Sequence, residues 1–401
     1  MKDVRKISDD ITYVGVSDRK LALFESAYPI PEGISYNSYF VNDEKTVLFD
    51  TVDKACSLQF LENIEYVLGS KELDYIVVLH MEPDHCALLS DIVKMYPNVK
   101  IVCTAKTVAL IKQFFNFDTE SRTIVVKDGD TLNTGVHEFV FYTAPMVHWP
   151  EVMVAYDKKD KTLYSADAFG SFKPINGILD DTYLDFENEY LDEARRYYTN
   201  IVGKYGPQVQ MLLKKVSGFD INAIYPLHGL IIKNNISKFI DKYDKWSRYE
   251  SEEKNVLIAY SSVYGGTENA VNILAGKLAD KGAKKIKMYN VSHTHHSYVL
   301  ADAFKYSHIV FATTTYNNGI FESMEQLLHN ISAHNLQNKK VVLIQNGSWA
   351  PTCGNAMKTI LQGLKGVEIL DESLCIHSSL KEEQMADLER ISDSIIKSIN
   401  E

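Results

Sequence analysis

Cysteine is scarce in this sequence, and its few cysteines follow no recognisable metal-binding or disulfide pattern. The 401 residues include five cysteines, and no two of them have the C-x-x-C spacing. An odd number without that spacing argues against a disulfide framework and against a four-cysteine zinc or iron site. The disulfide-rich secreted class and the cysteine-bound metal modules are therefore excluded.

Long apolar runs and basic runs are also missing. No uninterrupted apolar stretch approaches the ~20 residues that cross a bilayer, and the N-terminus, MKDVRKISDDITYVG, lacks the apolar core of a signal peptide. The net charge is −11, without the clustered Lys and Arg that phosphate contacts need. We therefore expect a cytoplasmic globular protein that binds neither membranes nor nucleic acid.

Two domains are expected, with a boundary near Glu250, because the pattern of the sequence changes there. Residues 241–255 are strongly charged and are the best candidate for a linker. After them, the short apolar runs NVLIAYSS, KKIKMYNV, HIVFATTT and KKVVLIQNG alternate with helix-like stretches. This alternation predicts a five-stranded, doubly wound parallel sheet over residues 251–401.

Residues 1–250 have a different pattern and are expected to form one α/β sandwich. Short strand-like segments such as ITYVGV, SYNSYFV and KTVLFDT come early, and helical patterns alternate with strands later. Mixed strands with interleaved helices are typical of such a layered domain.

The strongest chemical signal is the hexapeptide His80-Met81-Glu82-Pro83-Asp84-His85. It follows DYIVVL, which reads as a buried strand, so four potential metal ligands are expected in a loop at the end of a strand. The proline stiffens that loop and lowers the entropy lost when the loop is ordered.

Three more potential ligands stand just past short apolar runs: His148 after EFVFYTAPMV, Asp167 after TLYSA, and His228 after AIYPL. A lone histidine after a strand is more often a hydrogen-bonded residue than a ligand. Four histidines and three carboxylates in the same context are too many for one tetrahedral zinc and suit two octahedral ions, with one carboxylate bridging them.

The second domain contains three loops that suit a flavin mononucleotide. The first loop has a Gly-rich turn before a helix. It lacks both the lysine of a nucleoside triphosphate loop and the G-x-G-x-x-G motif of a dinucleotide fold. Neutral donors would therefore hold a phosphate there. Tyr316 and Trp349 offer aromatic surfaces for the isoalloxazine ring. The expected FMN contacts are Ser261, Ser262, Val263, Tyr264, Gly265, Gly266, Thr267, Thr315, Tyr316, Asn317, Asn318, Gly319, Asn346, Gly347, Ser348, Trp349 and Gly354.

The first domain resembles the metallo-β-lactamase superfamily, whose loop is usually H-x-H-x-D-H, and the second resembles flavodoxin. Glu82 stands where the hydrolases carry a second histidine, and a carboxylate there favours iron over zinc. The combination resembles the flavodiiron proteins, also called A-type flavoproteins, over essentially the whole chain. The expected fold is an αββα sandwich followed by a flavodoxin-like sheet.

This resemblance implies a reductase of O2 to water, of NO to N2O, or of both, with a scavenging role in an anaerobe or microaerophile. It implies that His80, Glu82 and His148 bind one iron, that Asp84, His85 and His228 bind the other, and that Asp167 bridges them. It also implies a head-to-tail homodimer, or a tetramer, that takes electrons from an external donor such as rubredoxin or a reduced flavin or deazaflavin system, since the absence of C-x-x-C excludes a fused rubredoxin.

The substrate pocket is the least defined part of the expected site. Many relatives carry a histidine near the position of Glu25, and Glu25 is taken as a pocket acid, with a solvated loop residue as the alternative. Tyr36 is taken as a second pocket residue, although a structural strand role remains equally open. A zinc hydrolase fused to a flavodoxin domain is the rival function, and Glu82 argues against it.

Overall fold

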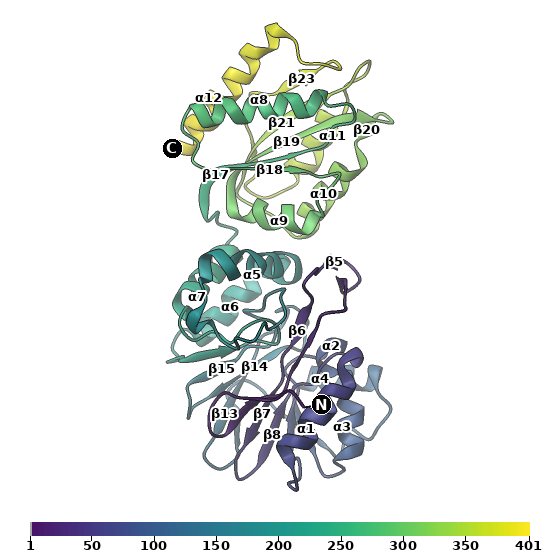
Figure 1. The fold of residues 1–401 in the computed structure, drawn as a ribbon, viewed down its shortest axis with the longest axis vertical. Coiled ribbons are helices and arrows are strands. Elements are labelled where there is room, and N and C mark those ends of the chain that lie inside the picture. Colours follow the sequence, from purple (N-terminus) through teal and green to yellow (C-terminus); the bar gives the residue numbers. More distant parts are fainter. Residues whose placement is uncertain (1) are drawn as a thin grey trace. The chain divides into compact units, whose positions relative to one another are not determined.

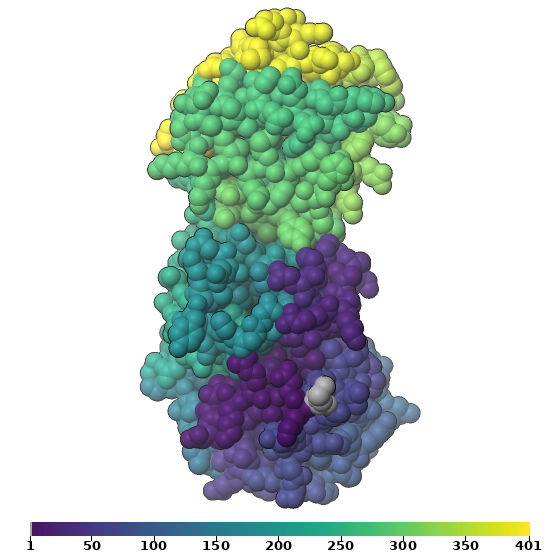
Figure 2. Space-filling model, viewed as in Figure 1, coloured from purple at the N-terminus to yellow at the C-terminus, as the bar shows by residue number. Residues whose placement is uncertain are grey.

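The structure, a computed structural model, describes residues 2–401. The chain divides into two compact units, one ending at Asp244 and one beginning at Lys245. None of the helices within residues 2–401 has both the length and the apolar character that crossing a bilayer requires. Figure 2 shows the N-terminal segment, in purple, spread over the surface of the first unit, and the C-terminal segment, in yellow, on the surface of the second.

The first unit is a sandwich of two β-sheets with helices on its outer faces (Figure 1). The first sheet has the order β1 (Arg5–Lys6), β2 (Ile11–Tyr13), β7 (Tyr39–Asn42), β8 (Thr46–Phe49), β9 (Tyr75–Val77), β10 (Lys100–Cys103) and β11 (Thr123–Val125). Its helices are α1 (Ser57–Leu68), α2 (Pro83–Cys86), α3 (Leu89–Met95) and α4 (Ala105–Phe114).

The second sheet has the order β12 (Thr131–Asn133), β13 (Glu138–Thr143), β14 (Met153–Asp157), β15 (Thr162–Tyr164) and β16 (Ala223–Tyr225). Helices α5 (Leu191–Tyr197) and α6 (Gly206–Val216) lie between β15 and β16 in sequence, and α7 (Ile236–Ser247) follows β16. Two small ribbons complete the unit: β3 (Val16–Asp18) with β6 (Ile34–Tyr36), and β4 (Leu23–Phe24) with β5 (Tyr28–Pro29).

Aromatic side chains join the two sheets. Phe49 of β8 stacks on Tyr164 of β15 with ring centroids 4.0 Å apart, and Tyr39 of β7 stacks on Tyr225 of β16 at 4.8 Å. All four rings are buried. Face-to-face packing of two sheets over such a core confirms the predicted αββα sandwich.

The second unit is a doubly wound sheet of the order β18 (Ile286–Asn290), β17 (Glu253–Tyr260), β19 (Tyr306–Tyr316), β21 (Lys340–Asn346) and β22 (Glu368–Ile369). β23 (Leu374–Ile376) also pairs with β21, and β20 (Gly319–Ile320) pairs with β19. Helices α8 (Gly266–Asp280) and α12 (Met385–Asn400) cover one face, and α9 (His296–Lys305), α10 (Glu322–Ala333) and α11 (Cys353–Gln362) cover the other (Figure 1). The predicted flavodoxin-like sheet is confirmed.

The predicted linker, residues 241–255, is wrong over ten of its fifteen residues, because seven belong to a helix and three to β17, although the boundary between the two units does fall within it. Residues 241–247 belong to helix α7, and only residues 248–252 separate that helix from β17. The charge of this segment is the solvated face of an amphipathic helix, whose other face carries the fully buried Phe239 and Tyr243. The Tyr243 hydroxyl accepts a hydrogen bond from the backbone N–H of Phe169 at 2.6 Å, which ties α7 to the first unit.

Candidate functional site

The structure brings all seven predicted ligands together in the first unit. They form two groups that each satisfy the geometry of a metal site: His80, Glu82, His148 and Asp167 in one, and Asp84, His85 and His228 in the other. All the ligands follow strand ends at one edge of the sandwich, after β9, β13, β15 and β16. Residues that are far apart in sequence therefore meet in one cluster.

Asp167 connects the two groups through its two carboxylate oxygens. Its Oδ2 lies 3.0 Å from Nε2 of His148 and 3.6 Å from Nε2 of His80. Its Oδ1 lies 3.3 Å from Nε2 of His85 and 3.8 Å from Nε2 of His228. One oxygen therefore faces each group, which is the geometry of a bridging carboxylate.

Several carboxylate oxygens of the cluster lack a hydrogen-bond partner in the described part of the chain, and this pattern fits metal ions. Within residues 2–401, both carboxylate oxygens of Asp84 and Oδ1 of Asp167 are buried without a hydrogen-bond partner. Nε2 of His85 and Nε2 of His228 point toward each other at 3.0 Å. Buried carboxylates are costly unless they are paired or bind a cation, so these residues fit two ions.

The electrostatics of the cluster also favour positive charge. Burial lowers the pKa of His148, but the carboxylates of Asp167 and Glu82 outweigh it and raise that pKa to about 9. For Asp167, burial raises the pKa, and the surrounding histidines bring it well below its usual range. The site therefore holds the Asp167 carboxylate ionised, and this negative charge attracts cations.

The local structure of the hexapeptide differs from the expected loop. Residues Pro83–Cys86 form the one-turn helix α2, with the proline in its first turn and Glu82 as the extended residue before it. Proline is favoured at this position because its ring presets the helical φ and its missing N–H is not needed there. The turn places Asp84 and His85 side by side in the second group.

Two carboxylates that the sequence analysis missed hold His80 in place. Oε1 of Glu151 lies 2.8 Å from Nδ1 of His80 and also accepts the N–H of Met81 at 2.9 Å. Oδ1 of Asp50 accepts the N–H of Leu79 at 2.9 Å. Partners of this kind fix the orientation of a metal-binding imidazole.

His228 is positioned by β6 and by the residue that follows it. Its Nδ1 lies 2.8 Å from the carbonyl oxygen of Ser35, leaving Nε2 free for a metal. Nδ2 of Asn37 donates to the carbonyl oxygens of Pro226 and Gly229 at 2.8 Å each, on either side of His228. The Tyr197 ring lies 5.4 Å from the His228 ring, and its buried hydroxyl has no hydrogen-bond partner within residues 2–401.

Backbone strain is concentrated around the ligands. Asp50, Met146 and Ala166 have positive φ angles of 53°, 65° and 51°, although none of them is glycine. Ala166 directly precedes Asp167, and Met146 lies two residues before His148. Strain of about 1–3 kcal/mol per residue persists where the surrounding structure overdetermines the backbone, as it does at binding sites.

A cavity of about 620 Å³ opens above the cluster, and Glu25 and Tyr36 both line it, together with Glu82, Asp84 and His148. Glu25 lies at the tip of the β4–β5 hairpin, where its φ of 49° is in the left-handed region. Burial of its carboxyl and the negative charge of Glu82 raise the pKa of Glu25 to about 8. Tyr36 is almost fully buried, with its ring 5.8 Å from that of His228.

The Gly-rich loop of the second unit has the geometry of a phosphate cradle. Gly265 has a φ of 87° and precedes the 15-residue helix α8. The hydroxyl of Ser262 accepts the N–H of Gly265 at 3.1 Å, and that of Ser261 lies 2.6 Å from the Thr313 hydroxyl. Hydroxyls and backbone N–H groups at a helix N-terminus suit a phosphate monoester.

The other two predicted flavin loops lie beside this one, at the carboxyl ends of β19 and β21. Nδ2 of Asn346 donates to the Thr267 hydroxyl at 3.3 Å, and the Thr315 hydroxyl accepts the N–H of Cys353 at 3.2 Å. Tyr316 and Trp349 are 53% and 82% exposed, so aromatic surfaces are available at the loops. The three loops therefore fit a flavin mononucleotide.

The remaining histidines do not add to the site. His293, His295 and His296 form no group of metal-binding geometry within residues 2–401. A third group, Asp10, His137 and Asp160, has that geometry, but the Lys159 ammonium already pairs with both of its carboxylates.

Comparisons with known proteins agree with this architecture. A family model described as ODP family beta lactamase matches residues 34–229. An uncharacterized protein of Methanocaldococcus jannaschii is 29% identical over 385 residues, 95% of each chain. The anaerobic nitric oxide reductase flavorubredoxin of Escherichia coli is 28% identical over 361 residues, 89% of this chain and 74% of that protein.

Solved structures match over the full length of both units. Rubredoxin oxygen:oxidoreductase from Desulfovibrio gigas has a TM-score of 0.92 at 26% identity and covers 99% of both chains. A flavo di-iron protein from Thermotoga maritima has a TM-score of 0.90 at 27% identity, with 99% and 98% coverage. The chain therefore belongs to the flavodiiron family of oxidoreductases, with a metallo-β-lactamase-like unit followed by a flavodoxin-like unit.

Proposed function

We propose that this protein is a cytoplasmic flavodiiron reductase that converts O2 to water, NO to N2O, or both, as a scavenger in an anaerobe or microaerophile. The observation that carries the proposal is the pair of ligand groups joined by Asp167. The similar proteins named above include both an oxygen oxidoreductase and a nitric oxide reductase, so both substrates enter the proposal.

We assign residues 1–250 to the metal domain and residues 251–401 to the flavin domain. In the metal domain, His80, Glu82 and His148 would hold one iron, Asp84, His85 and His228 the second, and Asp167 would bridge the pair. The carboxylate of Glu82 supports iron over zinc, because hard oxygen ligands suit iron and the hydrolases carry a histidine there.

In the flavin domain, the residues of the three loops would hold FMN. Hydroxyls of Ser261, Ser262 and Thr267 and the α8 N-terminus would bind the phosphate. Tyr316 and Trp349 would flank the ring, and backbone groups between Asn346 and Gly354 would reach its pyrimidine edge.

When bound, the iron pair and the reduced flavin would supply two electrons each. Four electrons and four protons convert O2 to two waters, whereas two electrons and two protons convert two NO to N2O and one water. Both reactions consume protons. Among the carboxyl groups that line the cavity and are not proposed metal ligands, Glu25 has a raised pKa. We propose that Glu25 and the Tyr36 hydroxyl line the path by which substrate and protons reach the metals.

The proposed partners are an external electron donor, either rubredoxin or a reduced flavin or deazaflavin system, and a second copy of the chain. A head-to-tail homodimer, or a tetramer built from such dimers, would bring the flavin of one subunit to the iron pair of another. A variant that is monomeric yet keeps full turnover would contradict this arrangement.

The test of the function is turnover of the iron-loaded and FMN-loaded protein under anaerobic conditions with one chemical donor and either O2 or NO added. A higher turnover rate with one gas than with the other assigns the substrate. The rival, a zinc hydrolase fused to a flavodoxin domain, predicts zinc without iron in the purified protein, no N2O from NO, and reduction of O2 by the flavin only as far as peroxide.

A further inference from the structure

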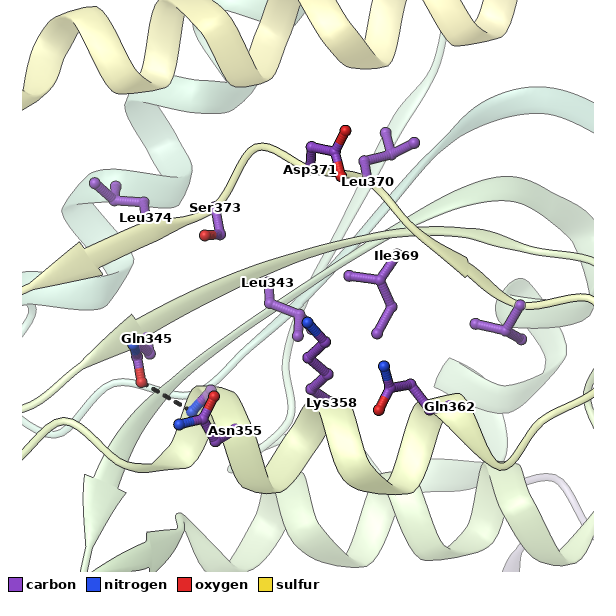
Figure 3. A pocket seen from close by; sticks show the side chains of 12 residues that line it. Leu343, Gln345, Asn355, Lys358, Gln362, Ile369, Leu370, Asp371, Ser373 and Leu374 are labelled. Carbon is purple, nitrogen blue, oxygen red and sulfur yellow. Dashed lines mark hydrogen bonds between the residues drawn. The ribbon is translucent and has the colours of Figure 1, made fainter.

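The edge of the second unit's sheet is interrupted next to β21. β22 pairs with Lys340 and Val341, and β23 pairs with residues 344–346, so four residues, 370–373, lie opposite Val342 and Leu343. The extra residues loop away from the sheet. A cavity of about 400 Å³ results between this loop, β21 and helix α11 (Figure 3).

The cavity has apolar side chains on its floor and polar side chains on both α11 and the loop. Leu343 and Ile369 form the floor, and Asn355, Lys358 and Gln362 project from α11 toward it (Figure 3). Their spacings of three and four residues place the three polar side chains on one face of the helix. Polar side chains make up much of the lining, and the volume lies within the range of small-molecule sites.

Lys358 brings a positive charge to the lining of the cavity. Its ammonium group forms no ion pair or hydrogen bond with any residue that the structure describes, and its stem runs toward Leu343 (Figure 3). Asp371, on the loop, also lines the cavity and is likewise unpaired within residues 2–401. Lys358 is exposed, so water solvates its ammonium group, and a carboxylate bound in the cavity would form a charge-assisted hydrogen bond with it.

We propose that this cavity binds a small organic acid, with its carboxylate on Lys358 and its apolar body on Leu343 and Ile369. The amide of Gln362, one turn along α11 from Lys358, lies on the same side of the cavity (Figure 3). Asp371 repels such a ligand and selects against dianions. The volume of about 400 Å³ is large enough for such a ligand.

The site is joined to the loop that we propose to hold FMN, and this step rests on the proposed function. Gln345 lines the cavity, and its Oε1 accepts the N–H of Gly354 at 2.9 Å. The bond closes the loop from Asn346 to Gly354 at its base. A ligand that moves Gln345 therefore changes the affinity for FMN, and by thermodynamic linkage FMN changes the affinity for the ligand equally.

The test uses hexanoate, titrated into the FMN-loaded and iron-loaded full-length chain and followed by methyl NMR signals of Leu343 and Leu374. We expect saturable shifts with hexanoate, and binding at least about tenfold weaker with 1-hexanol or acetate, which lack the charge or the apolar body. The local methyl signals separate this site from carboxylate binding at the metals. Absence of saturation at millimolar hexanoate overturns the proposal.

Charge variants provide the matched controls. Lys358→Ala is expected to weaken hexanoate about tenfold or more, and Asp371→Asn to tighten it, whereas Lys365→Ala, on the exposed turn after α11, is expected to change nothing. Equal affinity in the Lys358 and Lys365 variants overturns the assignment. An FMN dissociation constant unchanged by saturating hexanoate overturns the link to the flavin loop while leaving the acid site in place.

Discussion

The carboxylate of Glu151 lies 2.8 Å from Nδ1 of His80, and both side chains are buried. This hydrogen bond fixes the tautomer in which Nε2 of His80 is free for a metal. We expect Glu151→Gln to lower metal affinity about 10-fold and Glu151→Ala about 100-fold. Metal content after dialysis against a graded chelator measures the effect. Glu138→Gln, which removes a partly exposed carboxylate on β13, serves as the control, and equal losses in both would refute the role.

Asn37 spans both sides of His228 and should matter most for the second metal group. We expect Asn37→Ala to release the loop of His228 and to reduce bound metal from two ions to about one per chain. Tyr13→Phe removes only the hydroxyl that donates to Asn37 Oδ1 at 3.1 Å, and it should retain both ions. Elemental analysis measures the stoichiometry, and retention of both ions in Asn37→Ala would contradict this prediction.

Glu82 is expected to set the choice of metal. Glu82→His recreates the hydrolase pattern H-x-H-x-D-H and replaces an oxygen ligand by a nitrogen, which favours zinc. We expect the zinc-to-iron ratio after loading with equimolar metals to rise about tenfold or more. Glu72→His, at an exposed position before β9, should leave the ratio unchanged. An unchanged ratio in Glu82→His would mean that another ligand sets the preference.

Gly266 is expected to be essential for the phosphate cradle. A Cβ atom at Gly266 would lie 2.1 Å from the carbonyl oxygen of Ser378, which is backbone and cannot move aside easily. We expect Gly266→Ala to lose most of its flavin, measured by absorbance after gel filtration. Gly276→Ala, on an open face of the same helix, should retain flavin and gain about 0.5–1 kcal/mol of stability. Full flavin content in Gly266→Ala would show that the loop adapts.

His137 should make the stability of the first unit depend on pH. Its Nδ1 lies 2.7 Å from Asp157 and its Nε2 3.0 Å from Asp10. Burial lowers the pKa of His137, but hydrogen bonds to the two carboxylates outweigh it and the net shift is upward. The stabilisation is therefore complete below the unfolded pKa of about 6.5 and is lost as pH rises through the higher folded value.

We expect the free energy of unfolding of the wild type, relative to His137→Gln, to fall between about pH 6 and pH 9, as measured by urea denaturation. The exposed His377→Gln provides the comparison. A flat difference for His137→Gln would exclude the charged imidazole as the source.

The seven cluster residues were predictable because each stands just past an apolar run, and strands of one sandwich end at a common edge. Glu151 and Asn37 were not predictable in this way. They are common polar residues without periodicity, and the groups they bond lie 71 and 189 residues away in sequence. The prediction of a linker was wrong for a related reason. The many charged residues in 241–247 suggested an exposed segment, although the same stretch carries buried side chains of α7. The cavity above α11 depends on an interrupted edge strand, for which the sequence carries no turn signal.

The proposed ligands come from both layers of the first unit. His80, Glu82, Asp84 and His85 follow a strand of one sheet, and His148, Asp167 and His228 follow strands of the other. Bound metal would therefore act as a cross-link between the two sheets as well as a reaction centre. Free metal at 1,000 times its dissociation constant would add about 4 kcal/mol to the stability of the sandwich. Removal of the metal would then loosen the contact between the two sheets and expose the chain to unfolding and proteolysis.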